Sequence, residues 1–215
     1  MQYLFPQGVQ VDATGVASLV WKDGEGPFDQ ARTLSLNDRI ASVQYLTTAF
    51  TVAECEAVIS EGLAMPRMEG RVELGADAYR VSHIAWIEPR PSNHWLFHKV
   101  GALFTQVNQH YGFDLVGMVD ALQFTEYGPE QHFDWHMDIG PEETSLRKLS
   151  MTLQLSESGA YEGGELQFVG LGAGSQLRAQ GSATFFPSYL GHRVRPVTSG
   201  MRRSLVAWGS GTPFR

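Results

Sequence analysis

Several features are scarce in this 215-residue sequence, and each scarcity excludes a class of protein. Cys55 is the only cysteine, which rules out an intramolecular disulfide and a cysteine-based zinc site and is typical of a reducing compartment. Charged residues make up 18% of the chain, the net charge is −7, and the basic residues are scattered apart from Arg202 and Arg203. A nucleic-acid partner is therefore disfavoured, because phosphate binding requires clustered basic side chains.

Long apolar runs are also missing. No stretch approaches the roughly 18 apolar residues that a membrane span requires. The first twelve residues lack the basic and then apolar order of a signal peptide. We therefore expect a cytoplasmic protein with no membrane partner. The chain is instead 43% hydrophobic and contains 23 glycines, a composition typical of a turn-rich globular β protein.

Two helices followed by many short strands are predicted. Thr51 and Glu54 have the spacing of a capping box, after which apolar residues recur at helical spacing as far as Leu63. A second helix is predicted from about His94 to Tyr111, ended by Gly112. Alternating or apolar runs predict strands at 80–87, 118–127, 134–138, 147–156, 164–168, 183–187, 192–197 and 202–209.

This order of elements predicts a mainly β fold with supporting helices, a sandwich or jelly roll whose helices pack on one sheet. We expect a single domain over residues 1–215. Residues 1–117 would supply N-terminal strands and the supporting helices, and residues 118–215 would form the core.

The phase of alternation predicts a polar cavity. In 149–156 every second residue is leucine or methionine, and the residues between them are neutral and polar. The stretch 121–127 alternates in the same way. Exposed strand faces usually carry charges and these carry none, so we expect them to line a cavity while the apolar faces lie under the helices. The cavity residues would be Gln123, Thr125, Tyr127, Thr152 and Gln154.

A metal site is the chemistry that the histidines and one aspartate best support. His136 and Asp138 lie on the same side of a strand, because side chains repeat every two residues. His192 would complete a set of two imidazoles and one carboxylate, which occupies one face of an octahedral Fe(II) ion and leaves the other positions open. His132 and Asp134 have the same spacing and phase, and are a competing pair.

A cationic clamp is predicted on the last strand. Arg202, Ser204 and Val206 share one strand face, and a strand returning after His192 can aim Arg202 into the same cavity. A guanidinium in a polar pocket suits a bidentate salt bridge with a carboxylate. Arg203 is the alternative clamp, although it points to the opposite face.

A series of short motifs runs in order along residues 122–208: Tyr127-Gly128, Phe133, His136-x-Asp138, Leu149-Ser150, Leu155-Ser156, Tyr161-x-Gly163-Gly164-Glu165-Leu166 and His192-x-Val194-x-Pro196-Val197-x-x-Gly200-x-Arg202-x-Ser204. In these motifs the segment resembles the catalytic core of the prolyl 4-hydroxylase-like Fe(II)/2-oxoglutarate dioxygenases. The resemblance favours His136 over His132, because the spacing from Tyr127-Gly128 fits only that register.

The resemblance implies a double-stranded β-helix (jelly-roll) fold. It implies His136, Asp138 and His192 as Fe(II) ligands, and Arg202, Tyr127, Gln154 and Ser204 as 2-oxoglutarate-binding residues. Arg202 would hold the distal carboxylate, whereas Gln154 stands where some members carry a tyrosine. O2 would be the second co-substrate, and ascorbate is a candidate reductant. Without the resemblance, Tyr127 can equally be read as a core aromatic residue and Gln154 as an ordinary buried amide.

The function implied is hydroxylation of an unactivated C–H bond, with a prolyl residue in a peptide or protein as the leading substrate. A free amino acid or another small metabolite is the alternative. His132 and Asp134 would then contact substrate at the rim, unless they are simple surface groups. Two other classes remain open: a metal-binding jelly roll without oxygenase activity, and an interaction module with incidental histidines. Nothing in the sequence indicates the oligomeric state.

Overall fold

The computed structural model describes residues 8–11, 13, 16–20, 34–35, 39, 42–70, 72–74, 77–171 and 177–214. Contacts divide the chain into two compact units, residues 1–40 and 41–215. The first contains a three-stranded antiparallel sheet of β1 (Gly8–Val11), β2 (Val16–Val20) and β3 (Leu34–Ser35). The second contains the elements described below. The expected single domain over 1–215 stays a prediction.

Both predicted helices are confirmed. Helix α1 (Val52–Leu63) begins at Thr51, whose side chain accepts a hydrogen bond from the Glu54 amide while the Glu54 carboxylate accepts one from the Thr51 amide. A cap of this kind stabilises a helix by about 1 kcal/mol. Helix α2 (His94–Tyr111) follows a short 3-10 turn, η2 (Pro91–Asn93). It ends at Gly112, whose φ of 70° is the left-handed conformation that glycine adopts without strain.

Two antiparallel sheets form the body of this unit. The larger, eight-stranded sheet consists, in spatial order, of β4 (Gln44–Leu46), β15 (Ala183–Pro187), β12 (Arg147–Gln154), β18 (Arg202–Gly211), β10 (Leu122–Tyr127), β8 (His83–Ile87) and β5 (Met68–Glu69), with β9 (Leu115–Gly117) pairing with β18. The five-stranded sheet is ordered β14 (Leu166–Phe168), β16 (His192–Val194), β11 (His132–His136), β7 (Asp77–Val81) and β6 (Val72–Leu74). A hairpin of β13 (Tyr161–Gly163) and β17 (Val197–Gly200) and a 3-10 turn, η3 (Glu142–Leu146), complete the unit.

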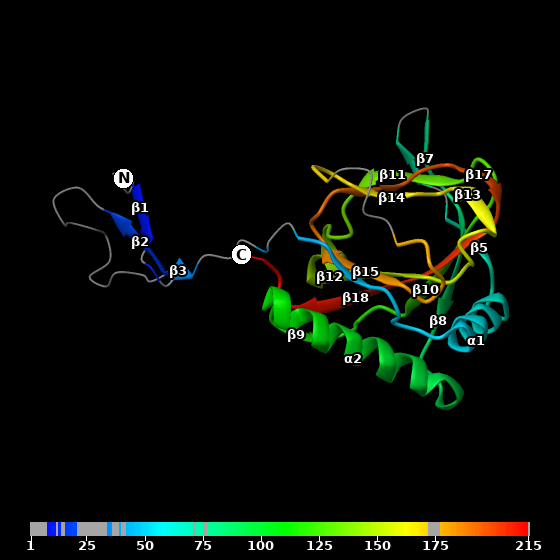
Figure 1. The fold of residues 1–215 in the computed structure, drawn as a ribbon, viewed down its shortest axis with the longest axis horizontal. Helices are drawn as coiled ribbons and strands as arrows, with labels where there is room; N and C mark the ends of the chain where they lie inside the picture. The colour runs from blue at the N-terminus through cyan, green and yellow to red at the C-terminus, as the bar shows by residue number, and fades with distance from the viewer. Residues whose placement is uncertain are drawn as a thin grey trace. The chain divides into compact units, whose positions relative to one another are not determined.

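The layers follow from the two faces of the large sheet. In Figure 1, α2 and α1 lie on one side of this sheet, and β11 and β14 of the smaller sheet lie on the other. The main core fills the helix side, where residues of both helices meet the apolar faces of β10, β12 and β18. Gly62 of α1 allows this close approach, because a Cβ atom there would lie 2.3 Å from the Phe124 ring. The prediction that the apolar faces lie under the helices is confirmed.

Several strand boundaries differ from the predicted ones. The run predicted as one strand at 80–87 is interrupted at Ser82, so that β7 belongs to the small sheet and β8 to the large one. The run at 192–197 is likewise split into β16 and the start of β17. In each segment the alternation of side chains continues where the chain passes from one sheet to the other. The two-residue pattern therefore does not reveal where one strand ends and the next begins. The arrangement is a jelly roll with helices on its major sheet, as predicted.

Neither α1 nor α2, nor any other helix of the described residues, is long and apolar enough to cross a membrane.

Candidate metal centre and its cavity

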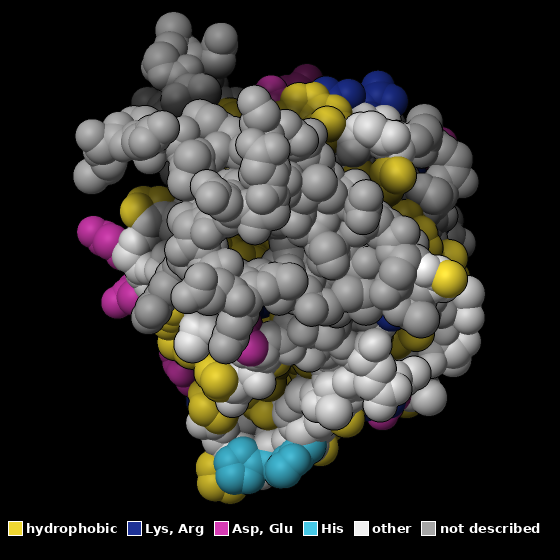
Figure 2. Space-filling model, turned by 90° about the vertical axis from the view of Figure 1, so that its left-hand side faces the viewer, with side chains coloured by type: hydrophobic (Ala, Val, Ile, Leu, Met, Phe, Trp, Pro, Cys, Tyr) yellow, Lys and Arg dark blue, Asp and Glu magenta, His cyan; other side chains and the backbone are white. Residues whose placement is uncertain are grey.

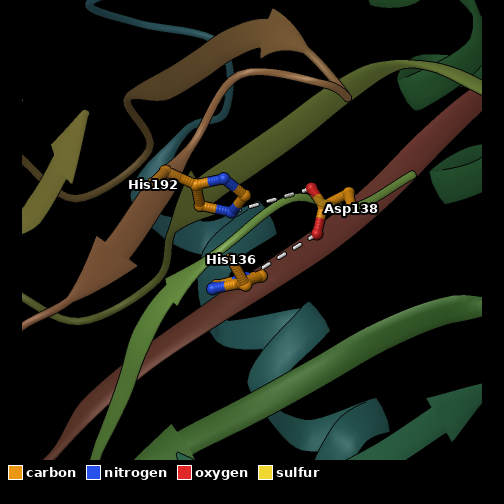
Figure 3. Close-up of side chains that lie close together, drawn as sticks. All are labelled: His136, Asp138 and His192. Carbon is orange, nitrogen blue, oxygen red and sulfur yellow. Dashed lines mark ion pairs between the residues drawn. The ribbon is translucent and has the colours of Figure 1, made fainter. Parts of the chain in front are cut away.

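Three side chains converge between the two sheets. His136 ends β11 and His192 begins β16, and these two residues are paired across the antiparallel ladder. Asp138 follows two residues after His136. One ligand atom from each of His136, Asp138 and His192 lies within 4.8 Å of the other two, and the described residues form no other such group. Figure 3 shows both rings directed at the Asp138 carboxylate, with each imidazole Nε2 at 3.8 Å from one carboxylate oxygen.

Backbone carbonyls fix the protonation of both rings. The Nδ1 atom of His136 lies 2.7 Å from the carbonyl oxygen of Asp134, and Nδ1 of His192 lies 3.0 Å from that of Leu190. A carbonyl oxygen can only accept, so each Nδ1 donates its proton, and in the neutral ring Nε2 is then the nitrogen whose lone pair can bind a metal. The two free lone pairs and the carboxylate oxygens face one another, which is the donor set that a divalent metal requires.

Asp138 is held by a serine of β12 and by Ser188, which follows the end of β15. Ser150 of β12 donates to Asp138 Oδ2 at 2.6 Å, and the Ser150 and Ser188 hydroxyls are 3.0 Å apart. The Asp138 amide donates to the Ser188 carbonyl at 2.9 Å. Burial alone would raise the pKa of Asp138, but His192, His136 and the Ser150 hydroxyl together hold it below the ordinary value. The carboxylate is therefore ionised and oriented before any metal arrives.

The electrostatics of His136 predict a pH dependence of the metal-free protein. Burial and the neighbouring His192 lower the pKa of His136 from 6.5 to about 4. The unfolded chain therefore binds this proton between pH 6.5 and 4 and the folded chain does not. The free energy of unfolding should fall as the pH falls through this window, by at most about 3 kcal/mol. Asp138 does not contribute to this decrease in stability. Because its pKa is lowered, it affects the free energy of unfolding only at pH values near and below the ordinary aspartate pKa.

Chemical denaturation of the metal-free protein at a series of pH values measures this slope. A His136→Gln variant cannot bind the proton, so it should lose most of the slope between pH 6.5 and 4. An unchanged slope in the variant would mean that His136 titrates normally in the folded protein.

The metal residues open into a cavity of about 370 Å³. Its lining contains several of the residues predicted from strand phase, namely Gln123, Tyr127, Thr152, Arg202 and Ser204. Thr125 is fully buried and accepts from the Gln123 amide at 2.9 Å. The polar face of the large sheet is therefore the floor of the cavity.

Arg202 places a buried cation in the wall of the cavity. Arg202 is only 3% exposed, and its Nη1 donates to Ser204 Oγ at 3.3 Å. No carboxylate among the described residues pairs with it. Its guanidinium lies 5.6 Å from the centre of the Tyr127 ring. A buried guanidinium without an anion is costly, which indicates that an anionic ligand belongs beside it. The alternative, Arg203, points away and pairs with Glu126 at 3.0 Å.

The Gly163-Gly164 pair makes room for this arginine. Gly164 has a φ of 64°, and a Cβ atom there would lie 2.9 Å from both Arg202 Cδ and a methyl group of Val197. The pair therefore lets the chain turn tightly against the Arg202 side chain.

Gln154, expected to bind 2-oxoglutarate, contacts a tyrosine in this structure, and its role toward the co-substrate stays a prediction. Its amide nitrogen donates to the Tyr161 hydroxyl at 3.0 Å. It lines a small space next to the cavity, together with Thr152, Tyr161 and Arg202. Tyr161 therefore places a hydroxyl group in the same small space as Arg202. In the sequence it was noted only as the first residue of the Tyr161-x-Gly163-Gly164 motif.

Sequence reasoning missed several residues of the cavity wall, among them Arg80, Arg147 and Trp208. Arg80 of β7 lies over the Phe133 ring at 4.7 Å, and its Nη2 atom is buried without a hydrogen-bond partner among the described residues. Arg147 stacks on Trp208 at 3.7 Å and is clamped by Asp120 at 2.8 Å. These residues lie outside the motifs that carry the family resemblance. Only the alternation of side chains along their strands could have indicated that they face the cavity.

The remaining predicted residues lie elsewhere. Neither His132 nor Asp134 is among the residues that line the cavity. Asp134 forms a long ion pair with Arg193 at 4.0 Å and His132 Nδ1 lies 3.1 Å from the Glu130 carbonyl. His94 and His98 are exposed on α2, and Figure 2 shows histidine side chains at the lower edge of the molecule, on the side that α2 covers.

Comparisons with known proteins agree with this geometry. Residues 122–210 match the family model of the 2OG-Fe(II) oxygenase superfamily. A PKHD-type hydroxylase of Thioalkalivibrio sulfidiphilus is 29% identical over 171 residues, which span 76% of this chain and 74% of that protein.

Two solved structures have the same fold. A prolyl-4-hydroxylase from Pseudomonas putida superposes with a TM-score of 0.59 at 20% identity, covering 80% of this chain and 94% of that one. A Trichoplax adhaerens prolyl hydroxylase, solved with a hypoxia inducible factor peptide fragment, gives a TM-score of 0.60 at 16% identity, with coverage of 78% and 83%.

Proposed function

We propose that this chain is a member of the 2OG-Fe(II) oxygenase superfamily, whose family model matches residues 122–210, and that it hydroxylates a prolyl residue of a peptide or protein. The observation that carries the proposal is one cavity containing both a two-histidine, one-carboxylate donor set and a buried arginine without an anion. A metal-binding jelly roll without oxygenase activity does not require the buried arginine. An interaction module requires neither the arginine nor the metal-binding residues.

His136, Asp138 and His192 are the proposed Fe(II) ligands. Metal ligands must be deprotonated, and the lowered pKa values of His136 and Asp138 keep the first ring neutral and the carboxylate ionised near neutral pH. When bound, iron and 2-oxoglutarate supply the oxidation: O2 converts 2-oxoglutarate to succinate and CO2, and one oxygen atom enters a substrate C–H bond. Asp138 occupies a ligand position that a small residue would leave open to a halide, and so favours hydroxylation.

Arg202 is the proposed partner of the distal carboxylate of 2-oxoglutarate. Ser204 orients its guanidinium, and the Tyr127 hydroxyl is available to the same ligand in the shared cavity. Burial raises the pKa of Tyr127, so this hydroxyl remains a hydrogen-bond donor. Gln154 was expected as a second partner. Its bond to Tyr161 makes Tyr161 a candidate for that position as well.

The substrate is inferred from the cavity wall and from the relatives. Trp86 and Trp208 line the cavity with their ring centres 6.2 Å apart, and such apolar aromatic walls suit a pyrrolidine ring. The Thioalkalivibrio relative is named as a hydroxylase, and the peptide complex of the Trichoplax prolyl hydroxylase supports a prolyl residue in a polypeptide. A free amino acid or another small metabolite remains the alternative.

The test uses purified protein with Fe(II) and 2-oxoglutarate under anaerobic conditions. We expect a weak visible charge-transfer band, followed by succinate formation on aeration. Ascorbate should prolong turnover if it serves as reductant. Absence of both the band and succinate would exclude the oxygenase function. A screen of peptides and free amino acids for stimulated succinate formation then distinguishes the two substrate classes.

A cytoplasmic location is also proposed, on the basis of the single cysteine. Cys55 is buried in the core, and its burial raises the pKa of its thiol to about 11. The thiol is therefore unreactive, and the chain contains no partner for a disulfide within itself.

A further inference from the structure

A second, shallower groove continues the metal cavity onto the surface. Its volume is about 500 Å³, and it shares Phe133, His136, Met137 and Ile139 with the cavity lining. Tyr79, Trp135 and Gly191 complete it. Because the two spaces share a wall that includes a metal-ligand residue, a substrate too long for the cavity has a continuous path into the groove.

Large apolar side chains on both sides of His136 line this groove. Trp135 is 39% exposed and Met137 is 57% exposed. The pairing of β11 with β16 shifts register between Phe133 and His136, and an irregularity of this kind re-aims the side chains of the bulged strand. Two exposed apolar groups next to a site of chemistry are unlike singly scattered surface residues and indicate a binding surface.

Trp135 is held in place from two directions. The Tyr79 hydroxyl donates to the Trp135 carbonyl oxygen, and Tyr79 packs edge-on against Phe133 with ring centres 5.8 Å apart. The Arg193 guanidinium lies 4.6 Å from the centre of the Trp135 ring. A supported aromatic ring loses little conformational entropy when a ligand covers it. The groove is therefore a preformed surface.

The charge of the groove favours an uncharged ligand segment. Arg193, the cation that the described residues place over the Trp135 ring, already pairs with Asp134 at 4.0 Å. The groove's own lining residues are aromatic, aliphatic or glycine apart from His136. Grooves of this composition bind extended, proline-containing segments, which expose apolar rings without the entropy cost of a flexible chain.

We propose that this groove binds the residues flanking the reacting residue of a polypeptide substrate, with Trp135 and Met137 contacting an uncharged apolar or proline-containing segment. The inference rests on the proposed hydroxylase function and deepens it. A free amino acid would be confined to the cavity and would leave the groove empty.

The experiment compares two degenerate synthetic pools, a nonapeptide with a central proline and random flanking residues, and a tripeptide with a central proline. Succinate formation by the iron-loaded enzyme should be stimulated about tenfold more by the nonapeptide pool at equal concentration, as expected for one good aromatic contact. The Trp135→Ala variant should reduce this ratio to about one. Anisotropy of the fluorescein-labelled nonapeptide pool, measured without oxygen, should show the same loss of binding.

Trp95→Ala is the matched control, because Trp95 lies on α2 and is 37% exposed; this variant should keep the ratio of the unsubstituted chain. Equal stimulation by both pools would overturn the groove proposal, and so would stimulation by free amino acids alone. An unchanged ratio in Trp135→Ala would overturn it as well. These outcomes leave the oxygenase function intact, whereas loss of the charge-transfer band and of all succinate formation in the unsubstituted chain removes both.

Discussion

Asp138→Ala is expected to abolish stoichiometric Fe(II) binding and to lower succinate formation by more than about 100-fold, since loss of a partner one step outside a metal site already costs 10- to 100-fold. The substitution removes the only carboxylate of the three-residue set and leaves two neutral imidazoles. The carboxylate also balances part of the metal's charge in a buried site, so its loss is not compensated by water. Isothermal titration of Fe(II) under anaerobic conditions measures the binding.

Asp134→Ala is the matched control for this substitution. Asp134 belongs to the competing His-x-Asp pair, and its side chain is 52% exposed and away from the cavity lining. This variant should bind iron like the unsubstituted chain. If instead Asp134→Ala lost the metal and Asp138→Ala kept it, the competing register would be correct.

Arg202→Met is expected to raise the KM for 2-oxoglutarate by more than about 100-fold, because truncating one partner of a buried charge pair costs about 2–5 kcal/mol. The methionine fills the space of the arginine stem and removes the guanidinium. The anion-free Arg202 is a desolvated charge in the metal-free protein, so this variant should be no less stable than the parent without ligand. The increase in Tm that 2-oxoglutarate gives by mass action should disappear.

Arg203→Met serves as the comparison, because Arg203 pairs with Glu126 and not with the cavity. It should keep the KM and the Tm increase of the parent, although it leaves Glu126 with only the weaker pair to Arg67. Arg202→Lys should recover part of the affinity, since an ammonium group supplies charge without the planar fork. A normal KM in Arg202→Met would mean that another group holds the distal carboxylate.

The sequence predicted the parts of the site that depend on local periodicity. The two-residue repeat sets the direction of every side chain along β12 and β18 before any tertiary contact forms. It therefore distinguished Arg202 from Arg203 and assigned Thr152 to the cavity side. The capping box at Thr51 and the terminal Gly112 likewise act within one helical turn, and both helices begin or end where these signals lie.

What periodicity could not predict is which distant polar groups meet. Ser150 was placed on the correct face, but its partnership with Asp138 depends on the register between β12 and the loop after β11. Arg80 enters the cavity because the chain changes sheets at Ser82. Gln154 points to the same side of β12 as Thr152 but lies two residues further along the strand. Because the sheet twists, its side chain contacts the Tyr161 hydroxyl.

The residues on the two faces of β12 are under different selection, for stability on one face and for ligand binding on the other. Leu149, Met151 and Leu153 lie in the core under the helices, whereas Ser150, Thr152 and Gln154 face the metal residue Asp138, the cavity and Tyr161. Divergence at the second set can alter which ligand the enzyme accepts while leaving its abundance in the cell unchanged. A single-residue deletion in this strand would exchange the two sets at once. Along β12, substitutions that change ligand preference without loss of stability are therefore expected at alternate positions.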